Sequence, residues 1–206
     1  PAGNNTIVVR GNSPKGVQWR LEGMEIPSPN HFSDDGSTGG PINVLNSDML
    51  DNSDFYTGAF AAEYGNVTSA VFDMRLRDGN DRKREYTLKL GSLGTDVTAE
   101  GPLPGIKGGS YLANYRYSTL ALLDAAGIVD YQGVPKYTDA AFKLKMPAGK
   151  AGTFSLFGIG GLSTISIKDE GVAGDTLFAS GDYGSRMGVF GLTHTLLLGT
   201  NNFLYS

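Results

Sequence analysis

Two histidines and a few acidic clusters are the side chains of this sequence that could do chemistry. His31 and His194 are the only histidines, and the chain contains no cysteine, which excludes thiolate-bound metals and disulfides. From a loop, His31 could contact a ligand or a metal ion, but a solvated loop histidine is the simpler interpretation. His194 falls within a predicted strand, where packing is the simpler role. Neither histidine by itself predicts a catalytic or metal site.

Three other segments suggest a specific chemistry that their spacing does not support. Residues 34–37 (Asp-Asp-Gly-Ser) and 78–81 (Asp-Gly-Asn-Asp) have the composition of calcium loops but lack the EF-hand spacing and its closing glutamate, so we expect turns. Residues 158–161 (Gly-Ile-Gly-Gly) precede no helix, so we expect strand glycines rather than a phosphate loop. No Ser-His-Asp arrangement or nucleophile elbow is present. We therefore expect no enzyme, no catalytic residue, no metal site and no cofactor.

Composition indicates a folded, β-rich chain. The 206 residues carry a net charge of -4 with a pI near 5.1, which does not favour nucleic acid as a partner. Charged residues make up only 18% of the chain, which has 30 glycines, 10 tyrosines and 10 phenylalanines, as suits many strands and tight turns. No apolar run reaches the roughly 18 residues of a transmembrane helix. The chain begins at Pro1 without an initiator Met, so we expect a piece of a longer protein or one that has lost a leader.

The first eighty or so residues predict a small mixed domain. Alternation predicts strands over residues 16–22 and 24–26, joined by a tight turn at Gly23, and a further strand over residues 69–77. Residues 27–41 form a long loop rich in proline and glycine, and a loop of that length is usually functional or disordered. Its histidine and phenylalanine are expected to be exposed. Shorter elements are expected as strands at residues 5–10 and 55–57 and as a short helix capped by Asn46 or Ser47.

The rest of the chain predicts one antiparallel strand after another. Four segments alternate polar and apolar residues cleanly, and three more do so in mixed or incomplete form. The clean segments are residues 85–91, 95–100, 110–119 and 139–146, and the others are residues 153–165, 185–198 and 202–205. Mostly short turns alternate with long connections, as in outer-membrane proteins. The strands of a soluble sheet with one solvated face also alternate between polar and apolar residues. The alternative to an outer-membrane protein is therefore a secreted β-rich module that binds carbohydrate or protein.

Three motifs in the first eighty residues carry a resemblance to a known family. They are Arg10-Gly11, the step from Glu22 to Pro27 (EGMEIP), and the run from Asp54 to Gly79 (DFYTGAFAAEYGNVTSAVFDMRLRDG). In their order and spacing they resemble the plug domain of a TonB-dependent outer-membrane transporter. Residues 115–118 (Tyr-Arg-Tyr-Ser) are similar to an early barrel strand of the same family. The run departs from the glycan-uptake pattern, so the resemblance does not carry a substrate class.

The resemblance implies a fold class and a division of the chain. The implied fold is an α+β plug, a small mixed sheet with short helices, followed by antiparallel strands of an incomplete transmembrane β-barrel. Residues 1–80 would be the plug without its TonB-binding segment, and residues 81–206 the first seven or so barrel strands. About seven strands cannot close a barrel around a plug, so the chain is expected to be a fragment.

The resemblance also implies transport rather than catalysis. The whole protein would be an energy-coupled importer in the outer membrane of a Gram-negative cell, for a scarce nutrient such as a siderophore, cobamide, glycan or peptide. The implied partners are TonB, which would bind upstream of Pro1, the nutrient and outer-membrane lipid. A surface lipoprotein lid is compatible with this set, and nucleic acid is not.

Two sets of residues follow from these expectations. The apical plug loop is expected to face the ligand through Asn30, His31, Phe32, Ser33, Asp34 and Asp35. Arg10, Arg75 and Arg77 are expected to join plug and barrel, because a guanidinium in a water-poor lumen needs carboxylate partners. A plain exposed arginine is the alternative for each of them. The candidate partners are Glu85, Asp96 and Glu100 on the polar faces of the predicted strands.

Overall fold

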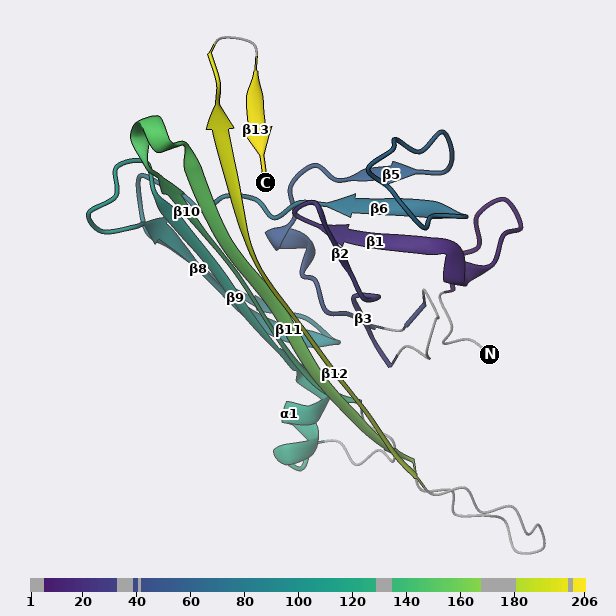
Figure 1. Cartoon of the computed structure of the whole chain (residues 1–206). Coiled ribbons are helices and arrows are strands. Elements are labelled where there is room, and N and C mark those ends of the chain that lie inside the picture. The colour runs from purple at the N-terminus through teal and green to yellow at the C-terminus, as the bar shows by residue number, and fades with distance from the viewer. Residues whose placement is uncertain (1–5, 33–38, 41, 129–134, 168–180, 200–201) are drawn as a thin grey trace, which may run out of the picture.

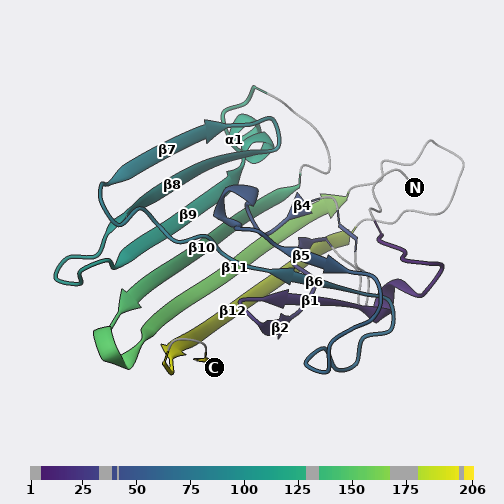
Figure 2. The same ribbon diagram turned by 90° about the horizontal axis from the view of Figure 1, so that it is seen from above.

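The computed structural model describes residues 6–32, 39–40, 42–128, 135–167, 181–199 and 202–206. Two sheets dominate it (Figure 1), a small mixed sheet formed by the first part of the chain and a long antiparallel sheet formed by the rest. The small sheet lies on one side of the long sheet, and no element covers the other side in this part of the chain (Figures 1 and 2).

The small sheet has four strands in the order β2-β1-β6-β5. Its strands are β1 (Val17–Leu21), β2 (Met24–Ile26), β5 (Asp54–Tyr56) and β6 (Ala70–Met74). β1 runs parallel to β6, whereas β2 and β5 pair antiparallel with their neighbours. A separate two-stranded ribbon pairs β3 (Asn30–His31) with β4 (Ile42–Asn43). We call residues 6–32, 39–40 and 42–77 the small-sheet region.

The long sheet has seven strands, and all neighbours in it are antiparallel. The order β13-β12-β11-β10-β9-β8-β7 follows the sequence, so each strand pairs with the next one along the chain (Figure 2). The strands are β7 (Glu85–Leu90), β8 (Gly94–Pro102), β9 (Ser110–Ser118), β10 (Lys136–Pro147), β11 (Thr153–Ile167), β12 (Gly181–Leu197) and β13 (Phe203–Tyr205). β7 and β13 are the edge strands.

Helical structure in the described residues is limited to short pieces. Single 3-10 turns are η1 (Pro14–Gly16), η2 (Ser47–Met49) and η3 (Gly149–Ala151). The α-helix of the described residues is α1 (Thr119–Ala125), and the Ser118 hydroxyl begins it by accepting a hydrogen bond from the amide of Ala121. None of the described helices has the length and apolar character that a membrane-spanning helix requires.

The pairing register gives the long sheet two chemically different faces. One row across the strands reads Tyr86, Ala99, Ala113, Phe142, Gly158 and Phe190, and the next reads Leu88, Val97, Tyr115, Ala140, Gly160 and Gly188. We call this side the apolar face. The intervening rows, including Lys89, Asp96, Arg116 and Asp139, form what we call the polar face. Because side chains alternate along a strand, this division follows directly from the period of two in the sequence.

The core of the molecule lies between the small-sheet region and the polar face. Leu21, Met49, Met74 and Leu76 on one side meet Leu112, Ala141, Phe157 and Ile159 on the other. Gly191 makes room for this contact, because a Cβ there would lie 2.2 Å from the Met24 side chain and 2.6 Å from the Phe157 ring. The hydrophobic contact between the sheets therefore occupies the middle of an otherwise polar surface.

The predicted fold class is wrong. An α+β plug with short helices, followed by strands of an incomplete barrel, requires helices in residues 1–80, but the described part of that segment holds only the one-turn η1 and η2. The chain is mostly β, with a small mixed sheet and an open seven-stranded antiparallel sheet. The short helix expected after Asn46 ends within one turn because Leu50 is already extended.

Most individual strands agree with the prediction. The segments expected at residues 16–22, 24–26, 55–57 and 69–77, and all seven expected later in the chain, correspond to strands β1, β2, β5 to β13. The strand expected at residues 5–10 does not form over its described part, residues 6–10. The strand expected at residues 110–119 ends at Ser118, because Thr119 already begins α1. The division of the chain at residue 80 stays a prediction.

Candidate functional site

Charged side chains join the small-sheet region to the polar face. Three buried or half-buried groups make this junction, which we call the ionic interface. They centre on Lys143 with Glu22, on Asp139 with His31, and on Glu100 with Arg77. Lys89 and Asp48 add a more exposed ion pair.

The first group surrounds Lys143 on β10. Its ammonium donates to Glu22 Oε1 at 3.0 Å and to the carbonyl of Leu76 at 2.6 Å, and it lies 3.2 Å from Asp78 Oδ1. Glu22 Oε1 also accepts from the amide of Leu76 at 2.7 Å. Glu22 and Lys143 are both buried. A buried ammonium and a buried carboxylate are tolerable only when they are paired and hydrogen-bonded in this way.

The turn between β1 and β2 places the Glu22 side chain beside Lys143. Glu22 has a φ of +51°, which is uncommon for a residue with a side chain. Its amide donates to the carbonyl of Met74 at 2.9 Å, while its own carbonyl accepts from the Tyr205 hydroxyl at 2.9 Å. The tight turn at Gly23 was predicted, but its function in placing a carboxylate against β10 was not.

Asp78 makes the first group sensitive to acid. Burial alone would raise the pKa of Asp78, but the hydrogen bond from Lys145 and the charges of Lys143 and Lys145 outweigh it and lower the pKa below its ordinary value. A carboxylate with a lowered pKa stabilises the folded state above its ordinary pKa of 3.8, and this contribution is lost as the pH falls through the lower folded value. We expect the free energy of unfolding to fall below about pH 4, and to fall less steeply in Asp78→Asn.

Urea titrations of the native chain and of Asp78→Asn between about pH 3 and pH 7 measure this dependence. Asp81→Asn is the matched control, because Asp81 is about half-exposed and its ion pair with Arg82 is long, at 3.9 Å. Equal acid slopes for the native chain and Asp78→Asn would contradict the prediction.

In the second group, the buried His31 side chain packs against the polar face and bonds Asp139. His31 is 1% exposed and Asp139 3% exposed, and the imidazole Nε2 is bonded to Asp139 Oδ1. Arg116 Nε donates to Asp139 Oδ2 at 2.8 Å, and the same guanidinium bonds the carbonyl of Asn43 on β4. A Cβ at Gly161 would lie 2.7 Å from the His31 ring, so glycine at this point of β11 leaves the space that the imidazole fills.

The third group joins Arg77 to β8. Its guanidinium bonds both carboxylate oxygens of Glu100, at 2.9 and 2.7 Å, and its Nε donates to the carbonyl of Asp48 at 2.6 Å. This two-point geometry is the one that favours arginine over lysine. Of the three arginines expected to join the two parts of the chain, Arg77 has a partner on the long sheet, and Glu100 is one of the expected partners.

The other two arginines are placed differently. Arg10 is exposed and donates to Thr57 Oγ1 within the small-sheet region at 3.4 Å, and it also lies beside Gly58. The Arg75 side chain is exposed, and its backbone carbonyl accepts from Asp51 at 2.8 Å. No ion pair to the long sheet is found for either one among the described residues.

The apical loop is described only in part. Asn30 lies on β3 opposite Asn43, and Phe32 follows at a φ of +56° with its ring 6.0 Å from that of His31. The expected exposure of His31 is wrong, because the long sheet covers it. Ser33, Asp34 and Asp35 lie outside the described residues. The ligand-facing role of the loop stays a prediction.

Sequence reasoning missed the partners on β9 and β10. Arg116, Asp139 and Lys143 were read as polar positions of alternating strands, without partners. A signal was present, because Asp139, Lys143 and Lys145 are spaced so that all three share one face. Their partners in the small-sheet region lie far away in the sequence and could not be named from it.

The charged groups of the ionic interface hold the small-sheet region against the long sheet. No group of three or more histidine, aspartate or glutamate side chains able to hold a metal ion occurs in the described residues. The glycines of residues 158–161 lie inside β11, as expected.

Comparison with protein-family models, with curated proteins and with solved structures finds no match. The resemblance to TonB-dependent transporters therefore rests on sequence motifs alone.

Proposed function

We propose that this chain is part of a TonB-dependent importer in the outer membrane of a Gram-negative cell, which takes up a scarce nutrient such as a siderophore, cobamide, glycan or peptide. The observation that carries the proposal is that the long sheet exposes its apolar face and covers its polar face. In a water-soluble protein the opposite arrangement is expected. An apolar face in contact with lipid accounts for it.

The apolar face carries more exposed large apolar side chains than is usual for a protein surface in water. Tyr86 is 72% exposed, Phe190 66% and Leu88 64%. Five further exposed side chains of this face are Leu90, Val97, Tyr115, Leu162 and Leu192. Contiguous apolar surfaces of this kind mark contact with a membrane or a protein. Alternation of apolar residues outward and polar residues inward is the pattern of outer-membrane strands.

The ionic interface supports a small-sheet region that can separate from the long sheet. Its charged groups gain water on separation, so their exposure costs less than that of an apolar contact of equal area. In an importer, the small-sheet region would be the part that TonB displaces through a segment upstream of Pro1. The loop that contains Asn30 and Phe32 would contact the nutrient, and a surface lipoprotein lid is compatible with this arrangement.

Lipid contact can be tested with single cysteines, because the chain has none of its own. Leu88→Cys and Phe190→Cys carry a fluorophore on the apolar face, and Lys15→Cys is the control because Lys15 is exposed in η1 of the small-sheet region, away from that face. In outer-membrane vesicles, spin-labelled lipid should quench the first two labels strongly and the control weakly. Equal, weak quenching at all three positions, together with solubility without detergent, would favour the secreted binding module instead.

Import itself needs a second measurement. Cells that produce the protein should accumulate its nutrient only when TonB is present and the inner membrane is energised. Candidate siderophores, cobamides, glycans and peptides are supplied in turn, and uptake is compared in cells with and without TonB. Lipid contact without TonB-dependent uptake of any of them would leave an outer-membrane protein and contradict the importer.

A further inference from the structure

Unpaired basic side chains gather at the end of the long sheet where its short turns meet. Arg84 stands just before β7, Lys107 lies in the turn between β8 and β9, and Lys150 lies in η3 between β10 and β11. All three are exposed, and none of them has an ion pair within the described part of the chain. Their neighbours Arg82 and Lys83 differ, because they lie 3.9 Å from Asp81 and 2.7 Å from Glu85.

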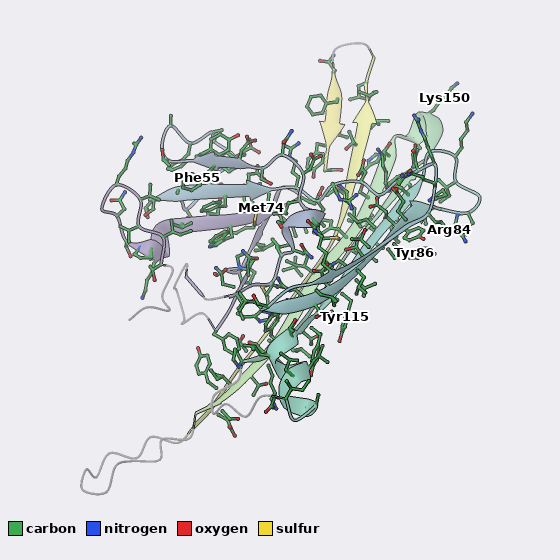
Figure 3. The ribbon with its side chains drawn as sticks, turned by 180° about the vertical axis from the view of Figure 1, so that it is seen from behind. Phe55, Met74, Arg84, Tyr86, Tyr115 and Lys150 are labelled. Atoms are coloured by element: carbon green, nitrogen blue, oxygen red, sulfur yellow. The ribbon has the colours of Figure 1, made fainter. Side chains whose placement is uncertain are left out.

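Arg84 belongs to the border of the apolar face. Glu85 pairs with Glu100, so Arg84 stands opposite Gly101, on the same side as Tyr86. A Cβ at Gly101 would lie 2.8 Å from the Arg84 side chain and 3.1 Å from the Tyr111 ring. Figure 3 shows Arg84 and Tyr86 on the side of the long sheet away from Phe55 and Met74. The arginine stem therefore covers apolar surface while its charged end is exposed.

The two lysines extend this border along the end of the sheet. A Cβ at Gly108 would lie 3.8 Å from Pro147, so the turn that carries Lys107 lies beside the end of β10. Lys150 follows in the next turn and, with Arg84, marks the same end of the sheet in Figure 3. Adjacent strands are about 4.8 Å apart, so the three cations form a row across the first five strands. We call Arg84, Lys107 and Lys150 the basic row.

At the opposite end of the sheet, lysines are already neutralised. Lys89 is paired with Asp48, and Lys136 lies 3.1 Å from Asp124. Among the described residues, the unpaired lysines of the long sheet therefore lie at its short-turn end, although the whole chain has a net charge of -4.

We propose that the basic row binds the phosphate groups of anionic phospholipids at the surface of the bilayer. This proposal rests on the proposed function, because it needs acyl chains against the apolar face. Basic side chains near an anionic membrane surface attract its headgroups, and guanidinium suits phosphate geometry. Tyrosine at the same border is typical of the membrane–water interface, and Tyr111 occupies that place. The short-turn end would lie at the periplasmic leaflet, which phospholipid forms.

The test uses a tryptophan beside the basic row. The chain carries Trp19→Phe, which removes its one tryptophan, and Tyr86→Trp, which places a reporter next to Arg84 on the apolar face. It is reconstituted into vesicles of brominated phosphatidylcholine or of brominated phosphatidylglycerol mixed with ordinary phosphatidylcholine. Quenching by either lipid reports acyl-chain contact, and the ratio of the two reports headgroup preference.

We expect quenching by both lipids, with phosphatidylglycerol preferred at least about fivefold, as one headgroup contact near the surface implies. Replacing Arg84, Lys107 and Lys150 together by glutamine should bring the ratio close to one. Lys15→Gln, which removes one charge from the exposed η1 turn of the small-sheet region, should leave it unchanged. Unchanged quenching by phosphatidylcholine in the triple variant shows that the sheet is still folded and in lipid.

The outcomes separate the two proposals. Equal quenching by the two lipids, or a preference that survives in the triple variant, overturns the headgroup site and leaves lipid contact standing. A preference that Lys15→Gln abolishes as well reports overall charge and also overturns the site. If neither lipid quenches the reporter, the apolar face is not in the bilayer and the proposed function fails with it.

Discussion

Replacing Lys143 with methionine is expected to lower the free energy of unfolding by about 3–5 kcal/mol, the usual cost of leaving one partner of a buried ion pair uncompensated. Without the ammonium, the amide of Leu76 is the one donor left to the buried carboxylate of Glu22 among the described residues, and the carbonyl of Leu76 loses the Lys143 donor. A methionine fills nearly the same volume as the lysine, so the loss of stability comes from the missing charge rather than from a cavity. Urea titration followed by the fluorescence of Trp19, which lies in the core between the sheets, measures it.

Two further variants decide whether pairing is the cause. Lys145→Met removes the same group two residues along β10, but Lys145 is 36% exposed and binds the partly exposed Asp78, so at most about 1 kcal/mol should be lost. Adding Glu22→Gln to Lys143→Met should restore part of the stability, because the unpaired charge is gone. Similar losses for Lys143→Met and Lys145→Met, with no recovery in the double variant, would show that the pair does not hold the sheets together.

The strands could be predicted because the alternation of polar and apolar residues that defines each strand lies within a short stretch of sequence. In β10, Ala140, Phe142 and Leu144 alternate with Asp139 and Lys143, which fixes both the strand and its two faces. The turn after Asn46 was predicted from its capping residue, although it is shorter than expected. The helix α1 was not predicted, because two turns after Ser118 leave almost no periodic signal. The fold class was wrong for a different reason: a family resemblance implied helices that the described part of residues 1–80 does not form beyond the single turns η1 and η2.

The candidate site was only partly accessible from the sequence. Arg77 and Glu100 were both chosen as charged residues in need of partners, and the structure pairs them. His31 was expected in solvent because a loop rich in proline and glycine carries it. Its burial depends on Asp139 and on the space at Gly161, which the chain reaches more than a hundred residues later. Such long-range pairs depend on how the sheets pack, and no local pattern contains that.

Replacing Asp139 with alanine is the second change with a large expected effect, again about 3–5 kcal/mol, because it leaves a guanidinium and an imidazole without their shared carboxylate. Arg116 would keep the carbonyl of Asn43 and its contact with the Tyr137 ring, and His31 would lose the partner of its Nε2. The loss should be local first, since both side chains hold the β3–β4 ribbon on the long sheet. Hydrogen exchange at the amide of Val44, which donates to the carbonyl of Pro29 at 2.7 Å, should speed up more than exchange at the amide of Leu76.

Asp139→Asn separates charge from shape, because the amide keeps the size and one acceptor oxygen. It should be less destabilising than Asp139→Ala but should still speed exchange at Val44, since a neutral group no longer offsets Arg116. Asp182→Ala, an exposed position on β12, is the matched surface control and should change stability by less than about 0.5 kcal/mol. Unchanged exchange at Val44 in Asp139→Ala would mean that the apolar contacts of Ile42 and Val44, rather than the buried charges, keep the ribbon in place. The β3–β4 ribbon would then be anchored without the ionic interface.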